Sequence, residues 1–222
     1  MGSEIAFAIA LVVAVAAIFW LILKSASGKI IAQYREIAHA LGVELTVPDS
    51  GMLGFTRPEP SLYGTYRDRE LSLSVPGKGL QNTRQIETIL KIELKNKTLN
   101  AQFTGAGLMG RFKQRDSGGQ SRWKSGNPDF DAAIDVRSNA GKRLRAVLDD
   151  AALNWIASTL KKNKGSLYLG NGTVVYTELG LISNETTRKR FEQVIEFLCD
   201  LAETVENTSF LEKTSNDLSK ED

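Results

Sequence analysis

The hydrophobic pattern of the chain begins with an unbroken apolar run from Ile5 to Leu23. At 1.5 Å per residue, this run would form a helix about 28 Å long, close to the roughly 30 Å of a bilayer's hydrocarbon core. The pattern therefore predicts a transmembrane helix, with residues 1–24 as the membrane anchor. The side chains that best represent its lipid-facing surface are Ile5, Phe7, Leu11, Val15, Phe19, Trp20 and Leu23.

A cleaved signal peptide is the alternative interpretation of this run. The residues before it, Met1–Glu4, carry no Lys or Arg, and the run is longer than the apolar region of a usual signal peptide. Ser25–Ser27 supplies small residues of the kind found at cleavage sites. The missing basic residues and the length favour the anchor.

The charges that flank the run predict its orientation. Only Glu4 precedes it, whereas Lys24, Lys29 and Arg35 follow it. Lys and Arg are concentrated on the cytoplasmic side of membrane helices. We therefore expect a single-pass protein of the bacterial inner membrane, with its soluble part in the cytoplasm.

Small residues recur along one face of the predicted span, at Ala6, Ala10, Ala14 and Ala17. Small residues allow two membrane helices to approach closely, so this face is a candidate homodimer contact. The same spacing also arises by chance in an alanine-rich anchor. The pattern leaves both interpretations open.

After Ser25–Gly28, which we expect to interrupt the apolar run, helical periodicity returns at Ile30, Tyr34, Ile37 and Leu41. This predicts a short juxtamembrane helix over 29–41 that ends at Gly42. Proline and glycine recur in the residues that follow, which indicates a loop. We assign 25–60 to a juxtamembrane helix and linker.

Residues 61–206 combine strand and helix patterns, which predicts an α+β domain. Alternating positions indicate strands at 62–66, 70–75, 85–94, 99–104 and 130–136, and the first two are joined by a turn at 67–69. We expect four or five of these strands to form an antiparallel meander. Because strands and helices do not alternate early in the chain, a parallel Rossmann sheet is disfavoured.

Two helices and a hairpin close the predicted domain. Asp149 or Asp150 is the expected cap of the first helix, and Asn184 caps the second. A Gly170–Gly172 turn joins the strands of a hairpin between them. The final helix has an apolar face at Phe191, Val194, Ile195, Leu198, Leu201, Ala202 and Val205. We expect the polar segment 207–222 to be a disordered acidic tail.

Composition narrows the possible functions. The net charge is only +2 in 222 residues, which argues against a dedicated nucleic-acid binder. One Cys and one His exclude an intramolecular disulfide, a cysteine metal cluster and a multi-histidine metal site. We expect Cys199 to be a packing residue and His39 to be solvated.

Catalytic and cofactor motifs are weak. Gly105–Gly110 has the form G-x-G-x-x-G, but the segment after it is too short for the required helix, and its flanks suggest antiparallel strands. No P-loop or G-x-S-x-G motif occurs. We therefore expect no cofactor and a non-enzymatic protein. An enzyme of unknown class would need a carboxylate such as Asp129 or Asp131 beside His39.

The glycine-rich segment 105–124 is basic and contains two aromatic residues. Its Lys and Arg side chains oppose only Asp116, and each basic residue near an anionic membrane is worth about 1 kcal/mol. The segment is therefore a candidate lipid-contacting loop, or a solvated loop whose aromatics fold onto the sheet. The candidate contacts are Arg111, Phe112, Lys113, Arg115, Arg122, Trp123 and Lys124.

The segment Ser125-Gly126-Asn127-Pro128-Asp129-Phe130-Asp131 is followed by a predicted strand, a leucine-rich helix, a hairpin and a final helix. With Leu62–Tyr66 upstream, this order resembles a family of uncharacterised, membrane-anchored bacterial proteins with a Pro-x-Phe-Asp box, over roughly residues 40–205. The resemblance implies an N-terminal anchor and supplies no catalytic residues. In this segment we expect Pro128 to start a strand, Phe130 to be buried and Asp131 to cap the preceding turn.

The leading hypothesis is a membrane-anchored interaction, scaffold or sensor domain with an unknown protein partner. The alternative is a lipid-head-group-binding, pleckstrin-like domain that acts through the basic loop 105–124.

Overall fold

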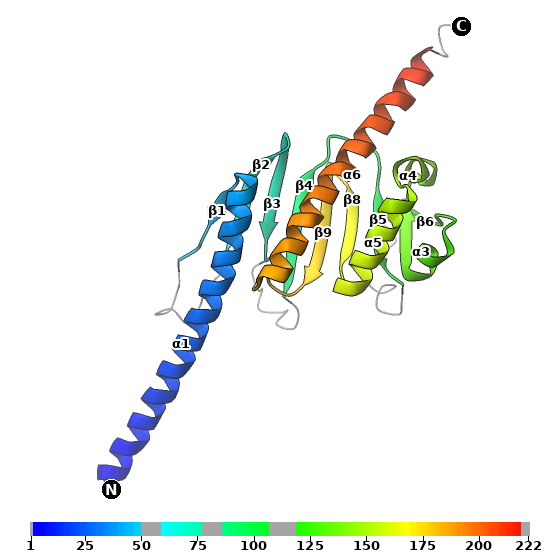
Figure 1. Cartoon of the computed structure of the whole chain (residues 1–222). Helices are drawn as coiled ribbons and strands as arrows, with labels where there is room; N and C mark the ends of the chain where they lie inside the picture. Colours follow the sequence, from blue (N-terminus) through cyan, green and yellow to red (C-terminus); the bar gives the residue numbers. More distant parts are fainter. Residues whose placement is uncertain (1, 50–58, 77–85, 107–118, 219–222) are drawn as a thin grey trace.

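A long N-terminal helix leads into a single sheet in the computed structural model, which describes residues 2–49, 59–76, 86–106 and 119–218. The helix, α1, spans Gly2–Leu41. Its N-terminal half projects away from the rest of the chain, and its C-terminal half packs beside the sheet (Figure 1). Ile30, Tyr34, Ile37 and Ala38 on this half are buried in the core.

The expected interruption at Ser25–Gly28 is wrong, because α1 is helical throughout this segment. A single glycine in a helix interior costs only about 1 kcal/mol relative to alanine, and serine costs less. Burial of the Ile30–Ala38 face easily offsets that cost. The helix ends as predicted at Gly42, whose φ of +66° is a left-handed conformation that glycine adopts without strain.

Within the described residues, nine antiparallel strands form one sheet in the order β1-β2-β3-β4-β9-β8-β5-β7-β6. The strands are β1 (Glu44–Thr46), β2 (Ser61–Tyr66), β3 (Arg69–Ser74), β4 (Glu87–Glu93), β5 (Ala101–Gly105), β6 (Ser121–Trp123), β7 (Ile134–Ser138), β8 (Ser166–Gly170) and β9 (Thr173–Leu179).

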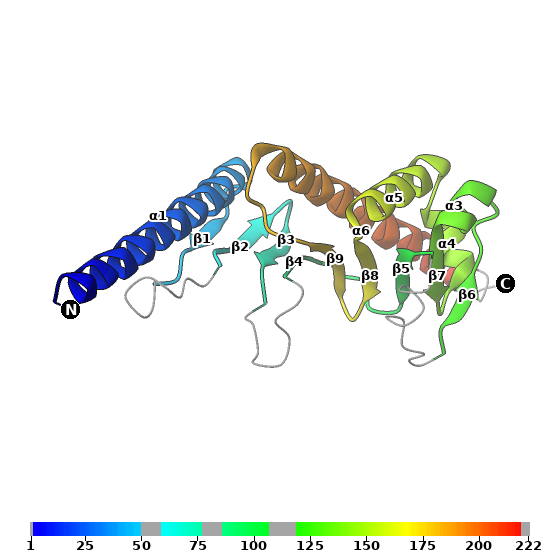
Figure 2. The same cartoon turned by 90° about the horizontal axis from the view of Figure 1, so that it is seen from below.

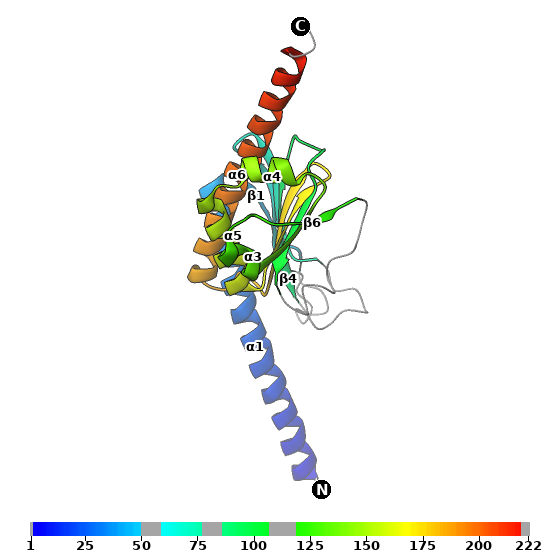
Figure 3. The same cartoon turned by 90° about the vertical axis from the view of Figure 1, so that its right-hand side faces the viewer.

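The remaining helices cover the same face of the sheet as the end of α1 (Figures 2 and 3). They are α3 (Pro128–Ala133), α4 (Gly141–Val147), α5 (Asp150–Asn163) and α6 (Glu185–Leu218). The α+β class predicted from the sequence is confirmed.

One row of directly paired side chains crosses the whole sheet beneath these helices. In spatial order the row is Leu45, Leu62, Leu73, Leu90, Tyr176, Leu167, Phe103, Val136 and Trp123. All of them are buried except the two at the ends, which are half-buried. Because every strand contributes one member, the core is continuous from one edge of the sheet to the other.

The predicted hairpins formed, but the expected meander is wrong after β4. The β8–β9 hairpin lies between β4 and β5, so β5 pairs with β8 instead of β4. Tyr176 and Leu167 of this hairpin join the apolar rows of β4 and β5. Edge strands β1 and β6 were not predicted, and the sheet is open.

The expected strand at 130–136 is also corrected, because residues 128–133 form α3 before β7 begins at Ile134. The Asn127 side chain caps this helix by accepting from the backbone N–H groups of Asp129 and Phe130. Pro128 occupies the first helical turn, where its missing N–H costs nothing. Phe130 is buried, as expected.

At the C-terminus, Asp149 and Asn184 cap α5 and α6 as predicted. The apolar face of α6 listed above is buried, together with Cys199. However, α6 continues to Leu218 and so includes most of the segment that we expected to be a disordered tail.

Candidate functional site

The apolar half of α1 is long and apolar enough to cross a membrane, or to serve as a signal sequence. None of its most apolar window is buried against the domain, and Phe7 is 72% exposed. Lys24 lies over the ring of Trp20, 4.9 Å from its centroid. The Ala6, Ala10, Ala14 and Ala17 face is exposed, and the homodimer stays a prediction.

The domain begins where the apolar run of α1 ends. Ser183, between β9 and α6, shares a shallow hollow of about 600 Å³ with Leu21, Ile22, Ser25, Ala26, Lys29 and Ile30 of α1. One helical turn further along, Nε of Arg188 in α6 donates to the Gln33 side chain over 3.2 Å. The junction is therefore a continuous helix, with the β9–α6 connection and the start of α6 beside it.

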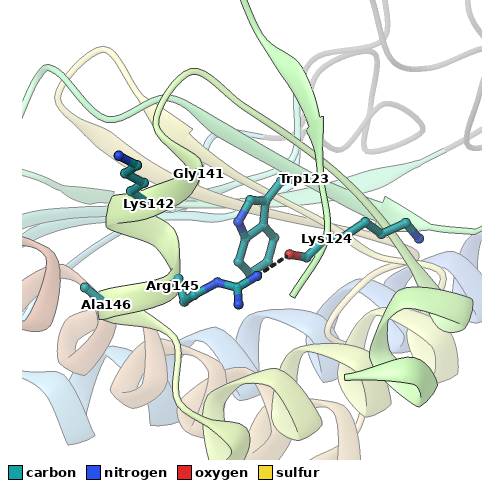
Figure 4. Close-up of a pocket in the computed structure, with 6 residues that line it drawn as sticks. All are labelled: Trp123, Lys124, Gly141, Lys142, Arg145 and Ala146. Atoms are coloured by element: carbon teal, nitrogen blue, oxygen red, sulfur yellow. Dashed lines mark hydrogen bonds between the residues drawn. The ribbon is translucent and has the colours of Figure 1, made fainter. Parts of the chain in front are cut away.

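A second hollow, of about 450 Å³, opens at the other edge of the sheet between β6 and α4 (Figure 4). Its lining residues are Trp123, Lys124, Gly141, Lys142, Arg145 and Ala146. The indole of Trp123 stands against the start of α4, and Nη2 of Arg145 donates to the Lys124 carbonyl over 3.0 Å. This pairs an aromatic ring with an exposed guanidinium.

Trp123 fits closely against α4 because residue 141 is glycine. A Cβ at this position would lie 2.6 Å from Cδ1 of the Trp123 ring. Any other residue at position 141 would therefore displace the ring or the helix. The β6–α4 hollow therefore depends on both Trp123 and Gly141.

The residues predicted to contact lipid are only partly gathered there. Arg111, Phe112, Lys113 and Arg115 lie outside the described residues. Arg122 forms an ion pair with Asp135 at 2.8 Å. Nζ of Lys124 donates to the Asp131 carbonyl over 3.1 Å, and its side chain points away from Trp123 in Figure 4.

Sequence reasoning missed Lys142 and Arg145. They are three residues apart on α4, a spacing that places two side chains on one helix face. That spacing was visible in the sequence, but the neighbouring strand β6 was not. Their proximity to Trp123 therefore could not be foreseen.

The two hollows lie at opposite edges of the sheet, and the α4 side of the second hollow also lies at the opposite end of the strands from Ser183. β7 ends at Ser138 and leads to α4, and Ser138 pairs with Ala101, which in turn pairs with Leu169. Leu169 is at the far end of β8 from Ser166, whose partner Thr177 leads toward Ser183. The start of α4 therefore lies at the end of the sheet away from the apolar half of α1 (Figure 1), whereas Trp123 pairs with Val136 in the middle of β7.

The Asp131 carboxylate forms hydrogen bonds that stabilise the turn before α3. It accepts from the backbone N–H and hydroxyl of Ser125 and from the N–H of Gly126, which is the capping role expected from the sequence. Burial raises the pKa of this carboxyl, but these hydrogen bonds together lower it by more than burial raises it. The net pKa therefore lies below its ordinary value. The group stays ionised at neutral pH and holds the turn.

The structure does not bring Asp129 or Asp131 to His39. α3 packs against β7 and α5, whereas α1 packs against β1 and β2 at the other edge of the sheet. His39 is exposed, as expected. Among the described residues, no three His, Cys, Asp or Glu side chains are grouped to hold a metal ion.

The β2–β3 turn is clamped by acidic residues of α6. Arg67 pairs with Glu196, Asp200 and Glu203, at 3.2, 2.8 and 2.8 Å. Arg69 is bound by Glu206, and the hydroxyl of Tyr66 donates to Glu196. This cluster offsets part of the negative charge on this face of α6 and fixes the helix across the sheet.

No protein-family model matches this chain, and neither the curated proteins nor the solved structures contain a match. The resemblance to a membrane-anchored bacterial family therefore remains a prediction.

Proposed function

We propose that this protein is a single-pass inner-membrane protein whose α+β domain is a non-enzymatic interaction module on the cytoplasmic face. The observation that carries the proposal is the continuity of α1. One helix contains both an exposed apolar run of membrane-spanning length and four residues buried in the domain core. A domain built on such a helix is held at the membrane surface in a defined orientation.

The same continuity favours an anchor over a signal sequence. Residues 25–27 lie inside α1, and Ser25 and Ala26 line the same hollow as Ser183 of the domain. The basic residues Lys24, Lys29 and Arg35 follow the apolar run, which favours a cytoplasmic domain.

For the interaction itself, we propose that the β6–α4 hollow receives an acidic segment of a cytoplasmic protein. Trp and Arg are enriched where proteins bind one another, and Arg145 and Lys142 add positive charge at this place. Lys142 lies in the first turn of α4, which follows the strand end opposite Ser183, and this favours a protein partner here over the alternative of a lipid head group bound through loop 105–124.

Membrane topology tests the main proposal. A fluorescent or enzymatic reporter fused after Asp222 should report a cytoplasmic location, and the fusion should stay with membranes after alkaline carbonate extraction. Release by carbonate would contradict the anchor. An exported reporter would contradict the orientation and place the domain in the envelope.

Binding of an acidic peptide tests the hollow. The full chain in nanodiscs of neutral lipid should bind a Glu-rich decapeptide in calorimetry, and Lys142→Glu with Arg145→Glu should weaken this binding at least tenfold. Lys91→Glu, on the opposite face of the sheet, is the matched control and should leave the affinity unchanged. Equal weakening by both would show non-specific charge attraction.

A further inference from the structure

One end of the sheet can be placed at the level where the apolar run of α1 ends. Ser166 of β8 pairs with Thr177 of β9, and Glu87 of β4 pairs with Leu179 at the same end. The chain leaves β9 there and reaches Ser183, which lies against residues 21–30 of α1. These strand ends therefore face the membrane surface if α1 spans the bilayer.

The C-terminal end of α5 lies at this same end of the sheet. Lys164 is the C-cap of α5, and the N–H of Gly165 donates to the Leu160 carbonyl over 3.1 Å before β8 starts at Ser166. Figure 1 shows α5 descending to the level at which α6 begins beside α1. Lys161, Lys162 and Lys164 are thus carried to the membrane side of the domain.

These three lysines are exposed, and in the part of the chain that the structure describes they form no ion pair. By contrast, Lys189 near the start of α6 pairs with Glu185 at 2.7 Å. A lysine near the C-terminus of a helix interacts favourably with the helix dipole, which accounts for Lys161 and Lys162. It does not account for Lys164, whose φ of 52° is a conformation that favours Gly or Asn.

We propose that Lys161, Lys162 and Lys164 contact the anionic head groups of the bilayer that α1 spans, and so hold the domain in one orientation on that surface. This inference rests on the membrane anchoring proposed above. It adds a lipid contact at the end of α5 to the one predicted for loop 105–124, most of which lies outside the described residues. Each lysine beside an anionic surface strengthens the contact about fivefold, since about 1 kcal/mol per charge corresponds to that factor.

Lysine acylation of the full chain in nanodiscs tests this contact. The chain is reconstituted in phosphatidylcholine alone or with phosphatidylglycerol, treated with a water-soluble acylating reagent, and analysed by peptide mass spectrometry. Acylation of the three lysines should be at least about threefold slower in the anionic discs, and 0.5 M NaCl should remove the difference because salt screens exposed charges. Lys142, at the other end of the strands, should react equally in both.

A variant pair makes the test specific. In Lys161→Glu with Lys162→Glu, the remaining Lys164 should lose its protection, whereas Lys142→Glu should leave it intact. Circular dichroism should show that both variants are folded. Equal acylation of Lys161, Lys162 and Lys164 in neutral and anionic discs would overturn the inference while leaving the anchor in place. A chain that does not co-elute with discs of either composition would instead overturn the anchor, and this contact with it.

Discussion

The Arg69 guanidinium is among the most buried charges in the described chain, with its side chain only 5% exposed. It donates to both carboxylate oxygens of Glu206, at 2.7 and 2.8 Å, and Glu206 also accepts from the backbone N–H of Lys95. This pair joins β3 and β4 to α6. Loss of one partner of such a pair lowers the stability of the fold, because the other charge then stays buried without a counter-charge.

We expect Glu206→Ala to lower the free energy of unfolding by about 3 kcal/mol, since Arg69 loses its counter-charge in a buried place. Glu203→Ala is the matched control, because Glu203 is 44% exposed and pairs with the more exposed Arg67. That change should cost about 1 kcal/mol or less. Urea unfolding of the full chain in detergent measures both, and equal costs would contradict the importance of burial.

The same carboxyl predicts a dependence on acid. Burial raises the pKa of Glu206, but hydrogen bonds from Arg69 and from the Lys95 N–H lower it more, so its net pKa falls below the ordinary 4.5. Its contribution to stability is therefore complete above about pH 4.5 and is lost as pH falls through the lower, folded-state pKa. In Glu206→Gln, unfolding curves recorded from pH 6 downward should lack this component. An unchanged acid profile would count against it.

Gly141 shows how one missing side chain shapes the β6–α4 hollow. Gly141→Ala would place a Cβ 2.6 Å from the Trp123 ring, so we expect the ring to move, with a loss of about 1–3 kcal/mol from overpacking. Gly105→Ala is the control, since nothing lies within 4 Å of its Cβ position. Thermal unfolding and tryptophan fluorescence should separate the two variants, and an unshifted emission in Gly141→Ala would refute the close contact.

At this residue scale, the sequence predicted the contacts that are local. Asp149, Asn184 and Asp131 bond to backbone groups a few residues away, and each was placed correctly as a cap. The Arg69–Glu206 pair joins residues far apart in sequence, so no local pattern could reveal it.

Among the elements, α1 has the largest consequence for function, because it joins the apolar run to the core without a break. Gly28→Pro should interrupt it by removing a helical hydrogen bond and by clashing with the preceding turn. We expect this variant to stay in the membrane while trypsin cleaves after Lys24 or Lys29 at least tenfold faster than in the wild type.

Gly28→Ala is the matched control for that variant. Nothing lies within 4 Å of its Cβ position, and alanine favours the helix by about 1 kcal/mol, so cleavage should become slower. Slow cleavage in both variants would mean that the domain is not held by the continuity of α1.

The elements also show where periodicity misleads. Phe130, Ala132, Ile134 and Val136 alternate as a strand would, yet the first two belong to α3. The Asn127 cap and Pro128 favour a helix start, and only six residues are involved. In so short a segment, cap chemistry overrides the alternation. At Ser25–Gly28 the error was the opposite, because weak helix-breaking residues were overridden by packing further along the helix.

At the scale of the whole molecule, α6 crosses much of the sheet (Figure 1), and Cys199 on this helix is buried. Burial raises the pKa of this thiol to about 11, so almost no thiolate is present at neutral pH. We expect the full chain in detergent to resist a maleimide reagent for hours and to react fully in 8 M urea. Reaction of Cys199 with the maleimide would then show that the core has opened.

Ser158→Cys in a Cys199→Ala background provides the control for reagent access, because Ser158 is exposed on α5. This variant should react within minutes under native conditions. Rapid native labelling of Cys199 itself would contradict the packing of α6 on the sheet.

The sequence alone determined the apolar run, the α+β class, the β2–β3 and β8–β9 hairpins and the buried face of α6. Each of these follows from spacing, turn chemistry or capping within a short stretch, where the physical causes are local. Even the expected burial of Cys199 needed only its place beside the apolar stripe of α6.

Only the tertiary structure decided the order of strands and the composition of each surface. The β8–β9 hairpin enters between β4 and β5 because its apolar rows complete a core row across the sheet, and pairing partners so distant in sequence leave no local trace. The same long-range pairing brings Trp123 to Gly141 and Arg145, and it carries the lysines of α5 to the level where the apolar run of α1 ends. Surfaces of this kind arise from the folded arrangement of several elements, whereas each element arises from its own stretch of sequence.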